Sequence, residues 1–390
     1  MMTDSPWGIL SGIRPVKIAM KQINCGMGDD EVIDFFKTEY SVCEDKARLA
    51  LDIAKVEKPI IDNMNSNGIS LYVGIPFCPT RCLYCSFVTN GIFRSKTLIP
   101  QYLDCLMREI EYTAEIVKEN GQIIESVYIG GGTPTTLEAF QLEMLIKKLF
   151  ESFDLSHIKE FTVEAGRPDT INEDKLKVIK SFDIERISIN PQSMNEETLK
   201  IIGRNHTPRQ IVEAYELARK CGIKTINMDV IAGLPGETFP MFQKTINEVE
   251  ALAPENTTVH TMSIKRSSRL NELLDEYDLT KGEEVAKMVD FARNTLREKG
   301  KHPYYLYRQK NMLGNLENIG YSTVGTESLY NIFIMEEVQT IVALGCGGVT
   351  KTVDRETDRI ERIFNVKEPK DYIERIDEML LRKDFLRNGR

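Results

Sequence analysis

The chain has 390 residues, of which 42% are hydrophobic and 28% charged, a composition that supports a large core and excludes a disordered chain. Its 50 basic and 59 acidic residues give a formal net charge of −9, which argues against nucleic acid as a partner because phosphate binding leaves a basic footprint. No apolar run approaches the roughly 20 residues of a membrane span, and none resembles a signal peptide, so we expect a cytoplasmic protein.

The first part of the chain is expected to be helical. Apolar residues recur at three- and four-residue spacing over residues 31–38 and 44–56, which predicts two helices. The run from Asn65 to Gly68 is a turn signal that separates these helices from a different pattern. We therefore assign residues 1–66 to an N-terminal helical segment.

From residue 70 onward, short apolar segments alternate with longer amphipathic ones. The apolar segments predict strands at residues 70–76, 126–130, 160–165, 186–189, 225–231 and 258–264. The amphipathic segments predict helices at residues 97–118, 137–150, 173–181, 208–221, 239–252 and 282–299. Such alternation indicates six βα units with a parallel sheet over residues 67–300. The spacing alone does not choose between an open sheet and a barrel.

The remainder, residues 301–390, has a mixed pattern that we treat as a C-terminal region of its own. Gly345 to Gly348 form a glycine-rich turn, and residues 371–382 have the pattern of a final helix. Residues 304–309 combine three tyrosines with an arginine and a glutamine. This segment is either an apolar strand with a polar end or part of the wall of a ligand pocket.

Eight cysteines are too few for a disulfide scaffold in a chain of this length. Five are scattered, and we expect them to be buried small hydrophobic residues: Cys25, Cys43, Cys105, Cys221 and Cys346. The other three, Cys78, Cys82 and Cys85, follow the first predicted strand directly. Three thiolates at the carboxyl end of a parallel strand would bind three corners of a cubane iron–sulfur cluster and leave one iron open for a ligand.

Two other chemistries fit the three cysteines less well. A structural zinc site needs four ligands, usually in two separated pairs, and neither a second pair nor a nearby histidine is present. A redox dithiol needs only two cysteines. The Cys-x3-Cys-x2-Cys spacing after a strand is therefore a specific signal for a cluster.

Further candidate ligand groups stand at the ends of the other predicted strands. Three glycines, Gly130 to Gly132, precede Thr133 and would let backbone amides approach a charged ligand closely, although they also suit a tight turn. Glu164, Gln192 and Asp229 follow or end the next three strands. Because the carboxyl ends of parallel strands meet at one edge, we expect these side chains to face a common ligand.

The three-cysteine motif resembles that of the radical S-adenosylmethionine (SAM) superfamily. The strings YVGIPFC at residues 72–78 and YIGGGTP at residues 128–134 are similar to those of the oxygen-independent coproporphyrinogen III dehydrogenase family. The strings RISINPQS, IGRNHT, NMDVIAGLPGET and YYLYRQKN continue the resemblance. The last of these, with PWGILSGIRP near the start, resembles the HemZ-like branch.

The resemblance implies a (β/α) partial barrel, a 4Fe–4S cluster on the three cysteines, and bound SAM. Tyr72, Gly131 and Glu164 would contact the SAM on the cluster. A second SAM would be contacted by Gln192, Arg204, Asp229, Tyr84, Gly132, Thr133 and Ser263. Carboxylates suit ribose hydroxyls or an ammonium group, and arginine suits a carboxylate. The resemblance assigns no catalytic side chain.

The implied activity is oxidative decarboxylation of coproporphyrinogen III to protoporphyrinogen IX, by a monomer that receives electrons from a flavodoxin or ferredoxin. Arg308 and Gln309 are candidate substrate contacts, and the candidate partners of the substrate propionates are Lys265, Arg266, Arg308, Lys310 and Lys351. Two alternatives remain open, a heme chaperone of the HemW type and a radical SAM heme-degrading methyltransferase.

The sequence departs from the family pattern at two places. Position 74 is glycine, where the family pattern YVHIPFC has histidine, and this change fits the HemZ-like branch. HemZ-like chains also carry a further segment before the PWGI string, so we expect a shortened member of the branch.

Overall fold

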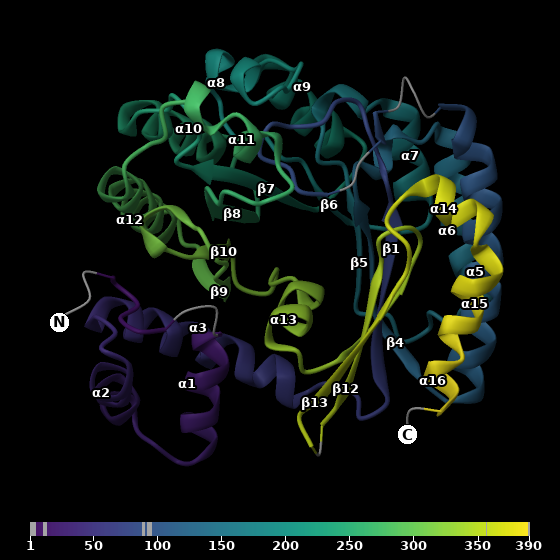
Figure 1. Ribbon diagram of the computed structural model, residues 1–390, viewed down its shortest axis with the longest axis horizontal. Coiled ribbons are helices and arrows are strands. Elements are labelled where there is room, and N and C mark those ends of the chain that lie inside the picture. The colour runs from purple at the N-terminus through teal and green to yellow at the C-terminus, as the bar shows by residue number, and fades with distance from the viewer. Residues whose placement is uncertain (1–4, 11–13, 88–89, 92–95, 356, 389–390) are drawn as a thin grey trace.

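The computed structural model describes residues 5–10, 14–87, 90–91, 96–355 and 357–388. Over these residues, one curved sheet of eleven strands forms the centre of the molecule, with the order β13-β12-β11-β1-β4-β5-β6-β7-β8-β10-β9. Figure 1 shows the sheet bending from β1 and β4 through β6, β7 and β8 to β9 and β10. The described residues include no helix that is long and apolar enough to cross a membrane.

The middle of the sheet is built from the six predicted strands. They are β1 (Gly68–Ile75), β4 (Ile123–Gly131), β5 (Glu160–Glu164), β6 (Arg186–Ser188), β7 (Thr225–Ala232) and β8 (Asn256–Thr261). Each pairs in parallel with the next along the chain, so the prediction of six βα units in a partial barrel is confirmed. Their carboxyl ends therefore gather at one edge of the sheet.

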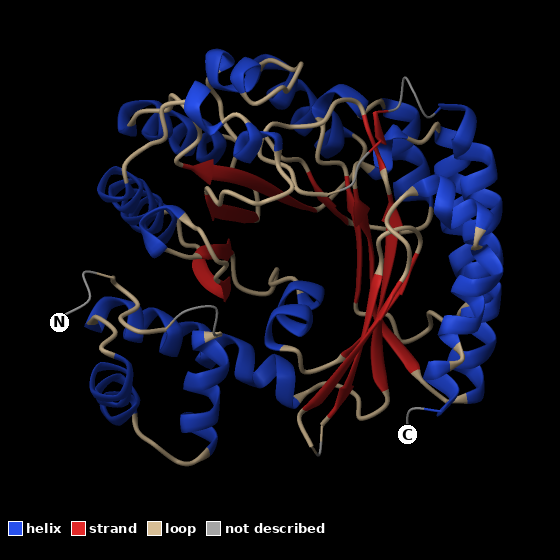
Figure 2. Ribbon diagram, viewed as in Figure 1, coloured by secondary structure: helices blue, strands red, loops and turns tan. Residues whose placement is uncertain are grey.

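Helices cover the outer face of this sheet, as Figure 2 shows. They are α5 (Ile99–Glu119), α6 (Ala139–Ser152), α7 (Glu173–Ser181), α8 (Glu196–Ile201), α9 (Pro208–Lys220), α10 (Phe239–Ala251) and α12 (Gly282–Glu298). In α5 the buried side chains include Leu103, Leu106, Ile110 and Val117, at the three- and four-residue spacing of one helix face. This face packs into the core shared with the strands.

The N-terminal segment forms a lobe of three helices, α1 (Pro15–Asn24), α2 (Asp29–Tyr40) and α3 (Glu44–Asp62). The latter two were predicted and are confirmed, whereas α1 was not expected from the sequence. Cys25 and Cys43 were wrongly expected to be buried. Both flank helices, Cys25 at the C-cap of α1 and Cys43 at the N-cap of α3, where the chain turns through solvent.

The C-terminal region contributes strands to both edges of the sheet. At one edge β10 (Asn318–Ser322) pairs antiparallel with β8 and with β9 (His302–Tyr307). At the other, β11 (Thr340–Leu344) pairs in parallel with β1 and is followed by the hairpin of β12 (Val349–Asp354) and β13 (Arg359–Phe364). The predicted glycine-rich turn joins β11 to β12. The sequence predicted one last helix, but the structure has two helices there, α14 (Pro369–Glu374) and α15 (Ile376–Lys383). The short helix α16 (Phe385–Asn388) follows them.

The helix α13 (Leu329–Glu336) lies in the segment that joins β10 to β11, inside the curve of the sheet (Figure 1). Glu160, the first residue of β5, fixes the start of this helix, because its carboxylate accepts hydrogen bonds from the Ser328 hydroxyl and from the backbone N–H of Leu329 at 3.0 and 2.9 Å. A carboxylate at a helix N-terminus satisfies free amides and complements the helix dipole. The sheet thus positions this helix on its concave side.

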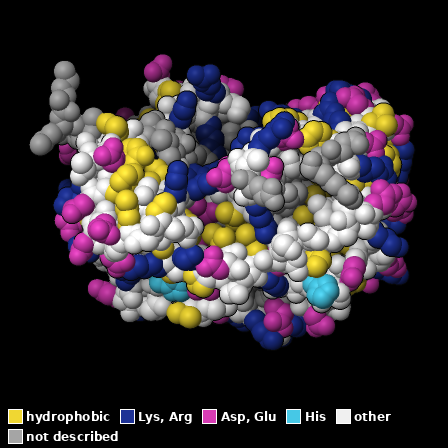
Figure 3. Space-filling model, turned by 90° about the horizontal axis from the view of Figure 1, so that it is seen from below, with side chains coloured by type: hydrophobic (Ala, Val, Ile, Leu, Met, Phe, Trp, Pro, Cys, Tyr) yellow, Lys and Arg dark blue, Asp and Glu magenta, His cyan; other side chains and the backbone are white. Residues whose placement is uncertain are grey.

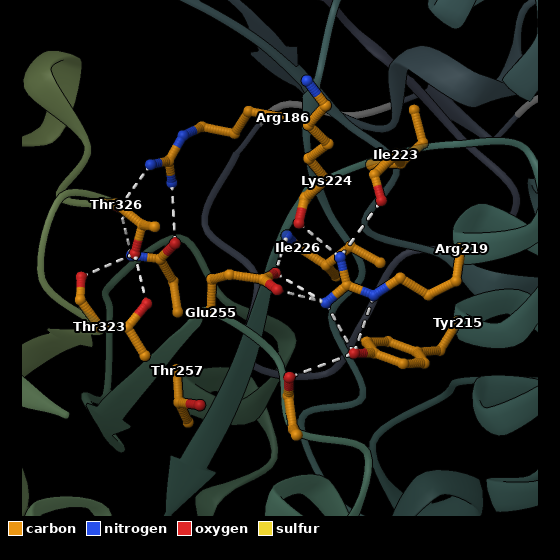
Figure 4. A network of polar contacts seen from close by, with 12 residues as sticks. Arg186, Tyr215, Arg219, Ile223, Lys224, Ile226, Glu255, Thr257, Thr323 and Thr326 are labelled. Atoms are coloured by element: carbon orange, nitrogen blue, oxygen red, sulfur yellow. Dashed lines mark hydrogen bonds and ion pairs between the residues drawn. The ribbon is translucent and has the colours of Figure 1, made fainter. Parts of the chain in front are cut away.

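Two arginines hold the amino-terminal ends of the strands together (Figure 4). Arg186 of β6 donates to Asn256 Oδ1 of β8 at 3.0 Å and to the carbonyl of Thr326. Arg219 of α9 makes two hydrogen bonds with the carboxylate of Glu255, at 2.8 and 2.7 Å. Such bidentate pairs fix geometry, so this end of the sheet is structural. Figure 3 shows acidic and basic side chains interspersed over the lower face of the molecule.

Candidate functional site

A cavity of about 540 Å³ opens at the carboxyl ends of the parallel strands. Its wall includes the three clustered cysteines, Cys78, Cys82 and Cys85. It also includes all but one of the residues that the sequence assigned to SAM, namely Tyr72, Tyr84, Gly131, Gly132, Thr133, Glu164, Gln192, Arg204 and Asp229. The side chains that the sequence predicted to share a ligand therefore meet in one place.

The loop that carries the cysteines, residues 78–86, is held by several neighbouring segments. The Thr80 hydroxyl donates to the carbonyl of Gly203 at 2.8 Å, and the backbone N–H of Leu83 donates to the carbonyl of Ile202 at 3.0 Å. Arg167 lies buried beside the loop and donates to Thr80 Oγ1 at 3.1 Å. These contacts fix the cysteine loop against the rest of the barrel before any ligand binds.

The three thiols differ in their surroundings. Cys82 is buried, and Arg167 Nη1 lies 4.0 Å from its sulfur. Cys78 Sγ lies 3.4 Å from Thr133 Oγ1, and burial raises the pKa of the Cys78 thiol to about 11 although this contact opposes the rise. A thiol with a raised pKa becomes a thiolate when a metal replaces its proton, so iron binding at these cysteines would release protons.

The three cysteines line the same cavity. Within the described residues, no group of three or more His, Cys, Asp or Glu side chains is arranged to hold a single metal ion. A structural zinc ion needs four converging ligands. In a cubane cluster each cysteine binds a different iron, so three cysteines on one loop would leave one iron open.

The glycines at the end of β4 and the start of the following loop serve packing as well as the cavity. A Cβ on Gly132 would lie 2.6 Å from the carbonyl oxygen of Phe77, too close for any side chain. The backbone N–H groups of Gly132 and Thr133 donate to the carbonyls of Ile75 and Phe77 at 2.7 and 2.8 Å. Two of the amides expected to approach a ligand thus hold the loop in place, and Gly131 and Gly132 line the cavity at the same time.

Glu164, the last residue of β5, faces the cavity from its floor. The Tyr128 hydroxyl donates to Glu164 Oε1 at 2.5 Å. Burial raises the pKa of Glu164 to about 7, and the bond from Tyr128 opposes that rise. A carboxyl group with this pKa changes charge near neutral pH, so its ionisation would respond to a cationic ligand.

Asp229 of β7 lies in a polar network in the same cavity wall. Its Oδ1 accepts a hydrogen bond from Asn227 Nδ2 at 2.7 Å, and His260 Nε2 lies 3.5 Å from its Oδ2. Burial opposes its charge, but His260 and Asn227 lower the pKa of Asp229 below its ordinary value. The His260 ring also lies within 3.2 Å of the Tyr307 hydroxyl. The lowered pKa therefore favours the carboxylate form of Asp229.

Gln192 has a left-handed backbone, with φ of 65°. Its backbone N–H donates to the carbonyl of Asp229 at 2.9 Å, which explains how the conformation is held. Glutamine seldom adopts this conformation, and strain of this kind is found at binding sites. The backbone here brings the Gln192 side chain into the cavity wall.

Arg204 is buried, and its guanidinium is only partly satisfied by the protein. Its Nη1 donates to the carbonyls of Asn190 and Gly166 at 2.5 and 3.2 Å. Its Nε has no partner among the described residues. Burial opposes the charge, yet Tyr84 and Cys82 raise the pKa of Arg204 above its ordinary value. A buried cation with an unused donor in a cavity wall suits an anionic ligand group such as a carboxylate.

Aromatic side chains form a further part of the cavity wall. Tyr72, Tyr128 and Tyr330 stack on one another, with ring centroids 6.4 Å apart for the first pair and 4.5 Å for Tyr128 and Tyr330. Tyr305 and Tyr307 of β9 form a second stacked pair at 6.3 Å. The lining continues with Ile334, Met335, Ile341, Val349 and Lys351. The rings offer flat apolar surfaces, and Lys351, whose Nζ lies 3.2 Å from Glu337 Oε1, is the only Lys side chain in the described lining.

Several candidates from the sequence lie outside this lining. Arg308 donates to the carbonyls of Leu10 and Asn315, and its guanidinium lies 5.2 Å from the Trp7 ring. Ser263 Oγ donates to the carbonyl of Lys310 at 3.1 Å. The described lining also lacks Gln309, Lys265, Arg266 and Lys310. Of the five suggested propionate partners, only Lys351 reaches the cavity.

The structure also identifies cavity residues that the sequence did not single out. Tyr128 is the first residue of the quoted string YIGGGTP, one pleat before Gly130, and Arg167 follows Glu164 by three residues, so these positions were the available signal. Tyr330 comes from α13, and His260 is one of only four histidines in the chain. No local pattern places α13 over the sheet, so Tyr330 was not predictable.

Comparison with known proteins decides the family. The Radical SAM superfamily model matches residues 72–249, the span that carries the cysteine loop and the strand ends of the cavity. The oxygen-independent coproporphyrinogen-III oxidase-like protein HemZ of Bacillus subtilis is 45% identical over 95% of this chain and 75% of its own length. The chain belongs to the radical SAM superfamily, among the oxygen-independent coproporphyrinogen III oxidase-like proteins. The cofactors of radical SAM proteins are a 4Fe–4S cluster and SAM.

Two further relatives show which kinds of protein resemble this chain. The heme chaperone HemW of Bacillus subtilis is 30% identical over 73% of this chain and 73% of its own length. The solved structure of coproporphyrinogen III oxidase (HemN) from Escherichia coli superposes with a TM-score of 0.62 and covers 84% of this chain and 73% of HemN. At 22% identity this superposition supports the fold alone. The family is therefore shared by a named oxidase and a named heme chaperone.

Proposed function

We propose that this radical SAM protein catalyses the oxygen-independent oxidative decarboxylation of coproporphyrinogen III to protoporphyrinogen IX. The observation that carries the proposal is the composition of the cavity at the strand ends. Its wall combines three cysteines and polar groups suited to SAM with stacked tyrosines, aliphatic side chains and Lys351. A large flat substrate with carboxylate side chains matches the aromatic and aliphatic part of this wall.

In this proposal Cys78, Cys82 and Cys85 bind the cluster. Tyr72, Gly131 and Glu164 contact the SAM on the cluster, and the second SAM group includes Gln192, Arg204 and Asp229. The unused Nε of Arg204 suits the carboxylate of a SAM molecule, and the Asp229 carboxylate suits ribose hydroxyls or an ammonium. When bound, the cofactors supply the 5′-deoxyadenosyl radical that removes a hydrogen atom from a propionate of the substrate.

The chain's own residues bind and orient the substrate and keep water away from the reacting carbon. Tyr128, Tyr330 and Tyr305 offer faces on which the macrocycle would rest, and Lys351 would pair with a propionate. Loss of carbon dioxide and transfer of one further electron to an external one-electron acceptor then leaves a vinyl group. The reaction occurs twice for each substrate molecule, so each of the two propionates must reach a newly formed radical.

The test is an anaerobic assay of the reconstituted protein with SAM, a reductant and coproporphyrinogen III. We expect protoporphyrinogen IX and two molecules of 5′-deoxyadenosine for each one formed. Lys351→Ala should raise KM for the porphyrinogen and leave the SAM affinity unchanged, because Lys351 is not among the residues assigned to SAM. Deoxyadenosine formed without any vinyl product would contradict the proposed substrate and leave the radical chemistry intact.

A second candidate is a heme chaperone, because HemW of Bacillus subtilis is 30% identical over most of the chain. The same aromatic wall would then hold heme rather than a substrate. Titration of the reconstituted protein with heme, followed by its absorption spectrum, separates the two functions. Tight heme binding with no protoporphyrinogen in the assay above would favour the chaperone.

A further inference from the structure

Three basic side chains from distant parts of the chain converge on one carboxylate beside the cavity. Arg14, at the N-cap of α1, pairs with Glu337 Oε2. Lys351 of β12 and Arg362 of β13 lie 3.2 and 2.9 Å from Glu337 Oε1. Lys351 also lines the cavity, so the group adjoins the cavity wall. We call these four residues the Glu337 cluster.

The fold holds the Glu337 cluster in a fixed arrangement. Lys351 and Arg362 are paired across the hairpin of β12 and β13, so their side chains project from the same face. Like charges directly opposite each other repel, and here both lie against the same carboxylate oxygen of Glu337. Glu337 has a left-handed backbone, with φ of 52°, at the end of α13, where glycine and asparagine are usual. The side chain of Glu337, rather than its backbone, therefore explains a glutamate at this position.

The Glu337 cluster carries more positive than negative charge. Among the described residues, none of Arg14, Lys351 and Arg362 pairs with a second carboxylate. Three cations around one carboxylate leave an excess of two positive charges. The Lys351 side chain is only 19% exposed, and burial lowers its pKa although Glu337 opposes this effect. Partly buried cations with N–H donors to spare suit an anionic ligand group.

The neighbouring acidic side chains do not cancel this excess. Asp354 and Glu361 alternate with the two cations of the hairpin, so they project from its opposite face. Glu336 is buried, and burial raises the pKa of its carboxyl to about 7. Burial also raises the pKa of Glu57, on α3, well above its ordinary value. Asp358 is highly exposed and lies 3.6 Å from the ammonium of a lysine in α1.

We propose that the Glu337 cluster binds carboxylates of the tetrapyrrole, namely the two propionates that do not react. The inference rests on the proposed function, in which two of the four propionates become vinyl groups and two leave unchanged with the product. The two surplus positive charges of the cluster match these two carboxylates. Arginine binds a carboxylate through two N–H groups at once, and lysine adds a further donor at the cavity wall. The macrocycle would then rest on the tyrosines while its unreacted edge is held at the cluster.

The test uses mesoporphyrin IX, a stable macrocycle with two propionates, and its dimethyl ester, which has the same ring and no carboxylate. Porphyrin fluorescence measures the binding of each to the reconstituted protein, in one detergent-containing buffer for both. We expect the wild type to bind the acid about tenfold or more tightly than the ester, as hydrogen bonds to charged groups imply. Arg14→Gln/Arg362→Gln should lower the affinity for the acid nearly to that for the ester, and leave the ester affinity unchanged.

Two further variants separate ligand binding from support of the fold. The matched control is Arg108→Gln/Arg297→Gln, because these arginines also pair with carboxylates of other elements, Asp377 and Asp52. The control loses the same charge and should bind both porphyrins as the wild type does. Glu337→Gln makes the opposite change, because it frees the three cations from their internal carboxylate. It should bind the acid more tightly than the wild type, whereas a purely structural network predicts equal or weaker binding.

The outcomes distinguish this proposal from the proposed function. Equal affinity of the wild type for acid and ester, or binding of neither, would overturn the carboxylate site whatever the anaerobic assay gives. Equal loss of acid and ester binding in Arg14→Gln/Arg362→Gln would also overturn it, because the cluster would then only support the fold. Absence of protoporphyrinogen in the assay would instead overturn the proposed reaction. A preference for the acid would still stand in that case, because heme carries the same two propionates.

Discussion

The Tyr128 hydroxyl donates a 2.5 Å hydrogen bond to Glu164 Oε1, joining the ends of β4 and β5 on the floor of the cavity. Glu164 is a carboxyl group with a pKa near 7, raised by burial and held from rising further by this bond. A tyrosine that stabilises the carboxylate thus sets the pH at which the floor of the site becomes negative. If Glu164 contacts SAM as proposed, this relationship makes SAM binding dependent on pH.

We expect the affinity for SAM, a cationic ligand, to rise with pH and to level off above about 7. The raised pKa means that the neutral carboxyl predominates below that value, and a cation binds the carboxylate. If SAM binds only this form, the affinity falls by up to about tenfold for each pH unit below the pKa. Equilibrium binding of SAM between pH 5.5 and 8 measures the effect.

Two variants check the assignment to Glu164. Glu164→Gln should bind SAM more weakly at pH 8 and with little pH dependence, because the amide does not ionise. Tyr128→Phe keeps the ring stacked on Tyr330 and removes only the donor, so the midpoint should move to higher pH. An unchanged midpoint in Tyr128→Phe would show that another group controls the titration.

Arg167→Gln should weaken retention of the cluster. The guanidinium of Arg167 bonds to Thr80 Oγ1 and lies near the Cys82 sulfur, so its loss frees the cysteine loop and removes a positive charge beside a thiolate. Iron content and the visible spectrum after reconstitution and desalting measure retention. The matched control is Arg186→Gln, a buried arginine at the other end of the sheet. The control variant should be less stable than the wild type but should keep its iron. Equal loss of iron in the two variants would point to general unfolding.

The sequence was sufficient to predict the six central strands and most of the cavity, for a physical reason. Parallel strands place their carboxyl ends at one edge, so Glu164, Gln192 and Asp229 had to converge once the βα alternation was recognised. The spacing of the three cysteines is a local feature of the sequence, so it could be recognised equally well. By contrast, the stacking of Tyr330 on Tyr128 and the addition of β11 to β1 join segments more than 200 residues apart. No periodicity within either segment specifies such pairings.

The contacts of Arg308 show the same limit of prediction from local sequence. Its motif suggested a pocket residue, but its partners Leu10 and Trp7 are about 300 residues away in sequence and were not deducible from its neighbours. The three glycines of the loop after β4 were assigned to ligand contact. The reason that Gly132 lacks a side chain, its approach to Phe77, is visible only in the structure.

Gly74 should tolerate alanine better than the histidine of the family pattern. A Cβ at this position would lie 3.2 Å from the carbonyl oxygen of Cys346, and the Tyr102 hydroxyl binds the Gly74 carbonyl at 2.5 Å. Alanine needs a small shift of the turn between β11 and β12, whereas an imidazole needs that turn to move away. We expect Gly74→His to cost about 1–3 kcal/mol of unfolding free energy, the usual range for overpacking. Urea unfolding of the two variants measures the difference. Equal unfolding midpoints would show that the turn between β11 and β12 moves without a cost in stability.

Arg308→Ala should lower stability and leave ligand binding unchanged. The side chain ties β9 to the N-terminal segment through the Leu10 carbonyl, and its guanidinium lies against the Trp7 ring. Hydrogen bonds from a charged donor contribute about 1.5–3 kcal/mol, so we expect a loss of that order in urea unfolding. Arg308→Lys should recover only part of it, because lysine lacks the planar fork that binds two carbonyls and stacks on the indole. If the variant keeps its unfolding midpoint and instead loses affinity for the porphyrinogen, Arg308 contributes to substrate binding.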